Sequence, residues 1–144
     1  KYLNPTDENL KIHKLLSHWT TSSQKKFDKM FKDLKKHPEL KAKMLLTTNE
    51  SGDYAIHIAC ENNNLYAIEK IVNETENQPE ILLNILRLKN GKGLTPMTIA
   101  SQNKDKSLWE YLKYANYYVA EKCKKGKKSP LTNILDLFSS CFKN

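Results

Sequence analysis

The fold is decided by Gly52-Asp53-Tyr54-Ala55-Ile56-His57-Ile58-Ala59 and by its second copy, Gly93-Leu94-Thr95-Pro96-Met97-Thr98-Ile99-Ala100. The two stretches stand 41 residues apart in the chain. Apolar residues on both sides agree at the same offset, pairing Ile56 with Met97, Ile58 with Ile99, Ile68 with Trp109 and Ile71 with Leu112. An internal repeat of this length is typical of stacked helical units, each of which buries its apolar face against its neighbours.

Each copy has the pattern of a turn followed by two short helices. Gly52 and Gly93 stand in polar segments, where glycine can adopt a positive φ without a steric penalty. Thr95-Pro96 predicts a helix start, because threonine caps a helix N-terminus and proline fits the first turn. The apolar spacing predicts antiparallel helix pairs over residues 54–61 and 65–74, and over residues 95–102 and 106–115. Ile58 and Ile99 are expected to be buried between stacked helices.

The repeated core resembles the ankyrin repeat, whose signature is Thr-Pro-Leu-His-x-Ala after a glycine-bearing turn. The second copy supplies Thr95-Pro96 and the first copy supplies His57, while Ala59 and Ala100 match the closing alanine. Tyr54-Ala55 and Thr98 depart from the signature, and the surplus over the usual 33-residue period lies between residues 72 and 89. The resemblance covers roughly residues 38–115 and implies a stack of helix pairs whose turn tips and inner helices form a concave binding face.

We therefore expect one all-α domain, an ankyrin-like helical repeat stack with N- and C-terminal capping helices. Residues 1–36 are predicted to be an N-terminal helical cap or degenerate repeat, with helices over residues 7–19 and 24–36. Phe27 is matched with Ile68 at the 41-residue offset. Residues 37–77 and 78–118 are the two ankyrin-like repeats, and short helices are expected after Pro38 and Pro79. Residues 119–144 are predicted to be a basic linker and a C-terminal amphipathic helix.

The composition limits the classes of function and setting. The formal net charge is +8, and it is carried by lysine, because Arg87 is the only arginine. Arginine reads guanine edges and clamps phosphates, so this balance argues against a dedicated nucleic-acid reader. Three widely spaced cysteines, Cys60, Cys123 and Cys141, fit neither a disulfide framework nor a zinc site, which favours a reducing, intracellular and cytoplasmic setting.

Two further features concern the source of the chain. The abundance of lysine and asparagine is typical of AT-rich coding genomes. It raises the hypothesis of an effector that an intracellular microbe secretes into a host cell. The start at Lys1 rather than at methionine suggests a trimmed or processed chain.

Candidate catalytic groups are few. His57 and Cys60 stand three residues apart on one predicted helix, the proximity that a nucleophile–base pair needs. The resemblance to ankyrin repeats instead makes His57 the signature histidine with structural hydrogen bonds and Cys60 a small core residue, which is the interpretation we adopt. The sequence contains no phosphate loop, zinc motif, nucleophile elbow or kinase motif. We expect no enzymatic activity, cofactor, metal or small-molecule substrate.

The resemblance implies a partner-binding face at the turn tips and inner helices. It assigns to this face Glu50, Asp53, Tyr54 and Glu61 from the first copy, and Lys92, Leu94, Gln102 and Asn103 from the second. Asp53, Glu61 and Leu94 are expected to be polar or exposed, so substitutions there should change the folding free energy little. Leu94 has two open interpretations, an exposed contact anchor or a side chain packed against a neighbouring turn. The predicted function is a non-catalytic module that binds a partner protein.

The C-terminal segment leaves alternatives open. Lysines cluster over residues 122–128, either as a solvated linker or as a site for anionic membrane or nucleic acid, which is the alternative function. No aromatic residue lies within this cluster. After Ser129-Pro130 an apolar stripe follows at helical spacing, made of Leu131, Ile134, Leu135, Phe138, Cys141 and Phe142. This helix is expected either to pack back on the last repeat as a cap, or to bind a partner's groove or a membrane surface.

Overall fold

The structure is a computed structural model that describes residues 8–125. Within this range all regular structure is helical and no strand is present, which confirms the all-α expectation. Eight α-helices and one 3₁₀ helix follow one another: α1 (Lys11–Ser17), α2 (Thr21–Asp33), η1 (Leu34–Lys36), α3 (Pro38–Leu45), α4 (Ala55–Glu61), α5 (Leu65–Thr75), α6 (Pro79–Leu86), α7 (Pro96–Ser101) and α8 (Ser107–Lys125).

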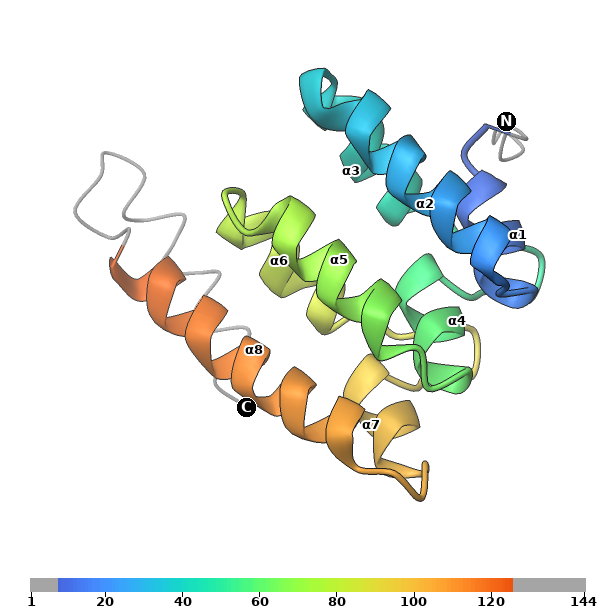
Figure 1. Cartoon of the computed structure of the whole chain (residues 1–144). Helices are drawn as coiled ribbons and strands as arrows, with labels where there is room; N and C mark the ends of the chain where they lie inside the picture. Colours follow the sequence, from blue (N-terminus) through green and yellow to red (C-terminus); the bar gives the residue numbers. More distant parts are fainter. Residues whose placement is uncertain (1–7, 126–144) are drawn as a thin grey trace.

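The helices are arranged in three successive layers. Figure 1 shows α2, α5 and α8 side by side in one row. The short helices α1, α4 and α7 follow one another in the same order in a second row. The short helices contact one another in sequence, α1 with α4 and α4 with α7. The α3 and α6 helices complete the first two layers, and α6 packs on α8. Each layer therefore contains a short helix (α1, α4 or α7), which we call the inner helix, followed by a longer one (α2, α5 or α8), which we call the outer helix.

The recurrence is visible in the helix caps. Thr20 Oγ1 accepts a hydrogen bond from the Ser23 N–H at the start of α2, and Asn64 Oδ1 accepts one from the Ala67 N–H at the start of α5, both at 3.1 Å. The two caps stand 44 residues apart, not 41. The difference arises because the segment from the start of α2 to α3 is three residues longer than that from α5 to α6.

This change of offset corrects one expected pairing in the first layer. Phe27 is matched by Ile71 rather than by Ile68. The predicted start of the α7 helix is confirmed, since Thr95 Oγ1 accepts from the Thr98 N–H and Pro96 opens the helix.

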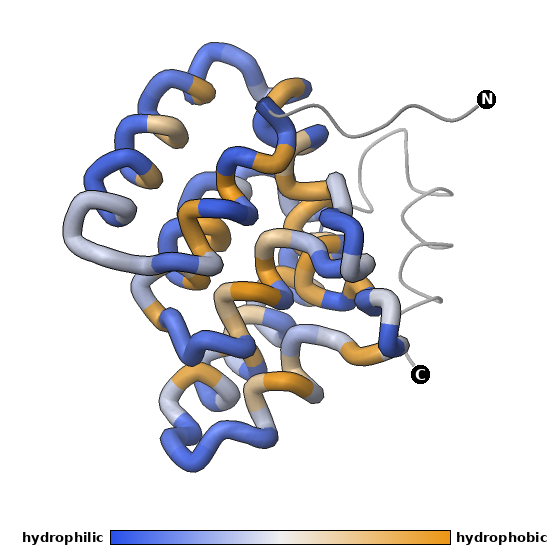
Figure 2. The backbone as a smooth tube through the Cα atoms, turned by 90° about the vertical axis from the view of Figure 1, so that its right-hand side faces the viewer, coloured by the Kyte–Doolittle hydropathy of each residue, from blue (hydrophilic) through white to orange (hydrophobic). Residues whose placement is uncertain are grey.

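The core is apolar and continuous through the three layers. Ile58 and Ile99 are buried, with 6% and 5% of their surface exposed, as predicted. Ala59 and Ala100 are fully buried, and their small side chains let neighbouring helices approach closely. Figure 2 shows apolar residues recurring along the helices between polar ones. Each fully buried large side chain, such as Phe27, stabilises the fold by roughly 1.5–3 kcal/mol.

One expectation for the C-terminal part needs correction. The α8 helix continues to Lys125, so Lys122, Lys124 and Lys125 belong to a helix and not to a linker. It continues because Val119 and Cys123 extend its buried side. The remaining lysines of the cluster and the helix predicted over residues 131–142 lie outside the described residues. None of the helices within residues 8–125 combines the length and the apolar content that crossing a bilayer requires.

Candidate functional site

The turn before α4, over residues 49–53, is called the first turn, and the turn before α7, over residues 90–94, the second. The first turn is built around the side chain of Asn49. Its Oδ1 accepts hydrogen bonds from the backbone N–H groups of Ser51 (3.0 Å) and Asp53 (2.9 Å). The Asn49 N–H donates in return to the Asp53 carbonyl at 2.9 Å. Gly52 adopts a φ of +82°, in the left-handed region that glycine enters without a Cβ penalty. This turn is therefore held in one shape by its own hydrogen bonds.

The second turn repeats the first in detail. Asn90 Oδ1 accepts from the N–H groups of Lys92 and Leu94, each at 3.0 Å, and Gly93 adopts a φ of +78°. The Asn90 N–H donates to the Leu94 carbonyl, again at 3.0 Å. The side chains that the two turns carry are consequently fixed relative to the helices.

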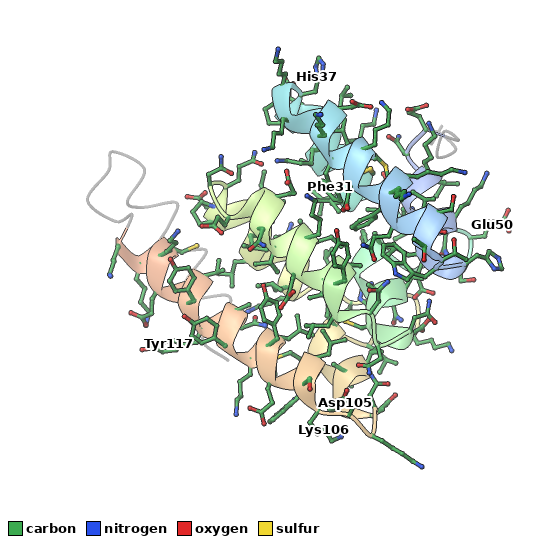
Figure 3. The ribbon with its side chains drawn as sticks, in the orientation of Figure 1. Phe31, His37, Glu50, Asp105, Lys106 and Tyr117 are labelled. Atoms are coloured by element: carbon green, nitrogen blue, oxygen red, sulfur yellow. The ribbon has the colours of Figure 1, made fainter. Side chains whose placement is uncertain are left out.

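The two turns are also bonded to each other. The Gly91 N–H donates to the Gly52 carbonyl at 3.0 Å, and Asn90 Nδ2 donates to Asp53 Oδ1 at 3.0 Å. The backbones approach so closely that a Cβ added to Gly52 would lie 2.8 Å from the Gly91 Cα. Figure 3 shows the side chain of Glu50, at the tip of the first turn, at the outer edge of the stack.

Two histidines connect the inner helices to the chain that enters the next turn. His57 Nδ1 accepts from the Tyr54 N–H at 3.2 Å, so His57 Nε2 carries the proton and donates to the Leu88 carbonyl at 2.9 Å. His13 Nε2 makes the same kind of bond to the Thr47 carbonyl at 2.8 Å. Burial lowers the pKa of both imidazoles, and the bonds to the backbone carbonyls oppose this shift in part. His57 therefore joins the start of its own helix to the chain that enters the second turn.

Cys60 lies in the core beside this histidine bridge. Its side chain is fully buried, and burial raises the pKa of its thiol to about 12. A thiol with such a pKa supplies almost no thiolate at neutral pH. The hypothetical nucleophile–base pair of His57 and Cys60 thus lacks a reactive nucleophile.

Asparagines tie the ends of the inner helices together. Asn62 Nδ2 donates to the Leu16 carbonyl at 2.9 Å, and Asn103 Nδ2 donates to the Cys60 carbonyl at 3.2 Å. Both bonds run from the end of one inner helix to the preceding one. Asn103, which the sequence assigned to the binding face, is half-buried and holds α7 against α4.

Among the eight predicted face residues, Glu61 feels the charges of two others, Asp53 and Lys92. Glu61, the last residue of α4, is exposed. Its pKa is raised, first by partial desolvation and then by the negative charge of Asp53, while the positive charge of Lys92 opposes the shift. Asp53, Glu61 and Lys92 therefore form a charged cluster, which we call the turn cluster.

The remaining face residues divide by exposure. Glu50 and Gln102 are exposed, and Tyr54 is half-buried with its ring centroid 5.6 Å from that of His57. Leu94 is half-buried and packs in part against the hydrophobic core. The structure does not support the expectation that Asp53 contributes little to folding, because its side chain accepts a hydrogen bond from the following turn. Asn103 likewise bonds the preceding layer.

Exposed tyrosines on α8 were not singled out by sequence reasoning. Tyr114 and Tyr117 are 65% and 67% exposed, and the Tyr114 ring stacks on Tyr118 with centroids 6.1 Å apart. Lys122 Nζ lies 5.0 Å from the centroid of the Tyr118 ring. Figure 3 shows Tyr117 pointing away from the stack. The burial pattern along α8 separates these exposed tyrosines from buried Ala115 and Val119 on the same helix.

A groove of about 510 Å³ opens at the other end of the stack, between α1, α2 and α3. Its apolar lining includes Leu15, Met30 and Leu40, and Lys26 and Lys29 are among its charged residues. Within residues 8–125 no group of three or more histidine, cysteine, aspartate or glutamate side chains is placed to hold a metal ion.

Comparison of the chain with protein-family models, curated proteins and solved structures finds no match.

Proposed function

We propose that the chain is an ankyrin-like repeat stack that acts as a non-catalytic module for binding a partner protein. The motif resemblance of residues 52–59 and 93–100 supports this assignment, as does the recurrence of turn, inner helix and outer helix. The observation that carries the function is the pair of bonded turns, which present the turn cluster and Glu50 at a fixed position. Surfaces that are ordered before binding lose less conformational entropy on association.

The charges of this face indicate the chemistry of the partner. Glu50 and Glu61 are exposed, and Asp53 adds a third negative charge close to Glu61. Lys92 is the positive counterpart on the second turn. A partner with basic side chains opposite Glu50 and Glu61, and with a carboxylate or carbonyl opposite Lys92, would match this pattern. Such complementarity sets specificity and association rate more than total affinity.

The first layer fits a degenerate repeat that also serves as the N-terminal cap. Its His13 bridge and the Asn62 bond to Leu16 repeat contacts made between the later layers. The setting that we propose is intracellular and cytoplasmic, and a host cell if the chain is a microbial effector. Cys60 and Cys123 are free and buried, which is compatible with a reducing compartment.

The test is affinity capture from cell extract with the full chain, at low and at physiological salt. Glu61→Lys and Lys92→Glu should each abolish capture of a specific partner and leave the thermal midpoint unchanged within error. Glu39→Lys, a charge reversal at an exposed position of α3, is the matched control and should capture normally. Normal capture by both turn-cluster variants would rule out this face.

A second candidate function is favoured by the tyrosines of α8. A lysine accompanies these exposed rings, since Lys122 Nζ lies over the Tyr118 ring, and Lys113 Nζ lies 4.6 Å from the centroid of the partly buried Trp109 ring on the same helix. Aromatic rings among lysines are typical of surfaces that bind single-stranded nucleic acid, and lysines alone bind anionic membranes. In this alternative the lysine-rich C-terminal segment is the binding element. Affinity for single-stranded oligonucleotides or anionic vesicles should then fall steeply as the salt concentration rises. Tyr117→Ala should also lower this affinity, while the turn-cluster variants bind normally.

A further inference from the structure

The last layer of the stack has an apolar side that the earlier layers cover. Ile56 and Ile68 in the middle layer are 1% and 0% exposed. Their counterparts in the last layer, Met97 and Trp109, are only partly buried within the part of the chain that the structure describes. Equivalent positions of the repeat are therefore fully buried in the middle layer and only partly buried in the last one.

The polar ties between layers also change at this point. Asp53 accepts a hydrogen bond from the following turn, but its counterpart Leu94 has no side-chain acceptor. His57 reaches the Leu88 carbonyl, whereas its counterpart Thr98 bonds locally with Thr95 at 2.9 Å. A further turn of the same kind would find none of these partners. The end of the stack is suited to an apolar covering element instead.

The α8 helix contributes a defined side to this surface. Trp109 and Ala120 are both partly buried against the core, and their separation of eleven residues is close to three helical turns. They therefore lie on the same side of α8. Together with Met97 they make what we call the end face.

We propose that residues 131–142 of the same chain cover the end face as an amphipathic helix. Their apolar residues recur at helical spacing, so one side of such a helix would be apolar throughout, with Leu131, Ile134, Leu135, Phe138, Cys141 and Phe142 on it. Ser129-Pro130 supplies a cap and a proline at the first helical position. The segment thus offers the surface that the end face lacks.

The length of the chain permits this contact. Residues 126–130 can span at most about 17 Å when extended. A helix over residues 131–142 would be about 18 Å long. Running back along α8 from Lys125, it has to reach Trp109, sixteen residues away, a distance of about 24 Å. The tether and the helix together exceed this distance, and a short tether gives an effective concentration in the millimolar range.

If residues 131–142 cover the end face, the Cys141 side chain lies on the covered side of the segment. Cys60 and Cys123 are 0% and 2% exposed, so Cys141 is the thiol whose labelling reports on this segment. The contact is separate from the turn cluster, so its outcome is independent of whether a partner binds there.

The experiment measures the rate at which a disulfide reagent labels Cys141 in the full chain under native conditions. We expect this rate to be at least about tenfold below that in urea, because labelling then requires local opening of the segment. Phe138→Asp in the segment and Met97→Asp on the end face should each raise the native rate at least about tenfold. Asn133→Asp, on the opposite side of the proposed helix, should leave it unchanged. Continued protection of Cys60 shows that each variant remains folded.

Other results would overturn the proposal. A native rate equal to the rate in urea, or a protected rate that neither substitution changes, would show that the segment does not cover the end face. Protection that grows with protein concentration, together with a dimer in sedimentation, would identify a second copy as the occupant. Protection that develops only after addition of vesicles containing phosphatidylserine would identify a membrane surface instead. Hydrogen exchange over residues 131–142 gives a second readout without substitutions.

Discussion

Asn90 and Asp53 stand 37 residues apart in the sequence and are joined by a 3.0 Å hydrogen bond from Nδ2 to Oδ1. The same Asn90 side chain shapes its own turn through Oδ1, which accepts from Lys92 and Leu94. One amide therefore fixes a turn and attaches it to the preceding turn. Asn90 is 7% exposed, so water cannot easily replace these bonds if they are lost.

Exchanging the amide of Asn90 for a carboxylate tests this bond. Asn90→Asp keeps an acceptor for the turn but removes the donor to Asp53 and opposes two negative charges. We expect a loss of about 1–3 kcal/mol in the free energy of unfolding at pH 7, measured by urea denaturation. The loss should shrink in acid, as one carboxyl becomes protonated. Adding Asp53→Asn restores a donor–acceptor pair and should recover most of the stability; a double variant as unstable as the single one would contradict the bond.

The two positive-φ glycines should respond differently to substitution. A Cβ on Gly93 meets no atom within 4 Å, so Gly93→Ala should cost only the left-handed backbone, about 1–2 kcal/mol. Gly52→Ala adds a clash with Gly91 and should cost clearly more in urea denaturation. Asparagine tolerates the left-handed region, so Gly93→Asn should be nearly neutral while Gly52→Asn remains destabilising. Equal losses at Gly52 and Gly93 would mean that the turns do not touch.

The helices of the last two layers followed from the sequence because their signals are local. Glycine turns, the Thr95-Pro96 cap and the apolar period act within a few residues of one another, and the 41-residue offset repeated them. Burial of Ile58 and Ile99 followed from the same period. Residues 119–125 were assigned to a basic linker because of their lysines, although Val119 and Cys123 keep one side of α8 buried as far as its last turn.

The candidate site was predicted less completely because its contacts join residues that are distant in sequence. His13 carries the same bridge as His57, but it lies at an offset of 44 and escapes a search at 41. The bonds of Asp53 and Asn103 to neighbouring layers have no local signature. Asp53 and Asn103 were therefore assigned to partner binding alone. Asn49 and Asn90, which shape the turns, carry the one sequence signal that could have revealed them, a shared position before Gly52 and Gly93.

The buried isoleucines should carry a large part of the stability of their layers. Replacing Ile58 or Ile99 by alanine should reduce the free energy of unfolding by roughly 2–4 kcal/mol each, because a buried side chain is lost and a cavity remains. Met97→Ala, at a partly buried position on the same helix as Ile99, is the matched control and should cost less. Urea denaturation measures all three. Losses below about 0.5 kcal/mol at both isoleucines would place them outside the core.

Stability should fall in mild acid because of the bridging histidines. The pKa values of His13 and His57 are lowered by burial in the folded state, so the neutral imidazole is favoured there. The unfolded chain takes up these protons as the pH falls below about 6.5, while the folded chain resists until its lower pKa is reached. The stabilisation from the two neutral imidazoles is therefore fully present above pH 6.5, and it is lost as the pH falls from there through the lower folded-state pKa. The negative charge of Asp53 favours protonation of both histidines, but burial has the larger effect.

The measurement is the free energy of unfolding between pH 8 and pH 5, with His57→Gln compared with the parent chain. The variant should be less stable at pH 8 and should lose less stability than the parent between pH 6.5 and pH 5. His37→Gln, at an exposed position, is the control and should follow the parent curve. Parallel curves for the His57 variant and the parent would show that this imidazole does not take part.

The turn cluster predicts how the carboxyl group of Glu61 titrates. Because Lys92 opposes the rise in the pKa of Glu61, Lys92→Gln should raise that pKa further. Asp53→Asn should lower it, since a neighbouring negative charge is removed. Carbon-13 NMR of the glutamate side chains measures both shifts, and Lys29→Gln on α2, whose lysine pairs with Asp33, is the control. If neither Lys92→Gln nor Asp53→Asn changed the pKa of Glu61, the charges of Lys92 and Asp53 would not act on this carboxyl group.

The same shift connects the cluster to partner binding. Because the folded-state pKa of Glu61 is raised, ionisation of this group opposes folding slightly, and the effect is complete once the pH exceeds the folded-state pKa. A cationic group of a partner placed against Glu61 would favour the ionised form and lower its pKa. Binding should therefore tighten as the pH rises through the pKa of Glu61, and Glu61→Gln should remove this part of the pH dependence. Isothermal titration between pH 4.5 and pH 7 measures it. An affinity that stays constant over this range, or that Glu61→Gln leaves equally dependent on pH, would show that the partner does not place a cation at this carboxylate.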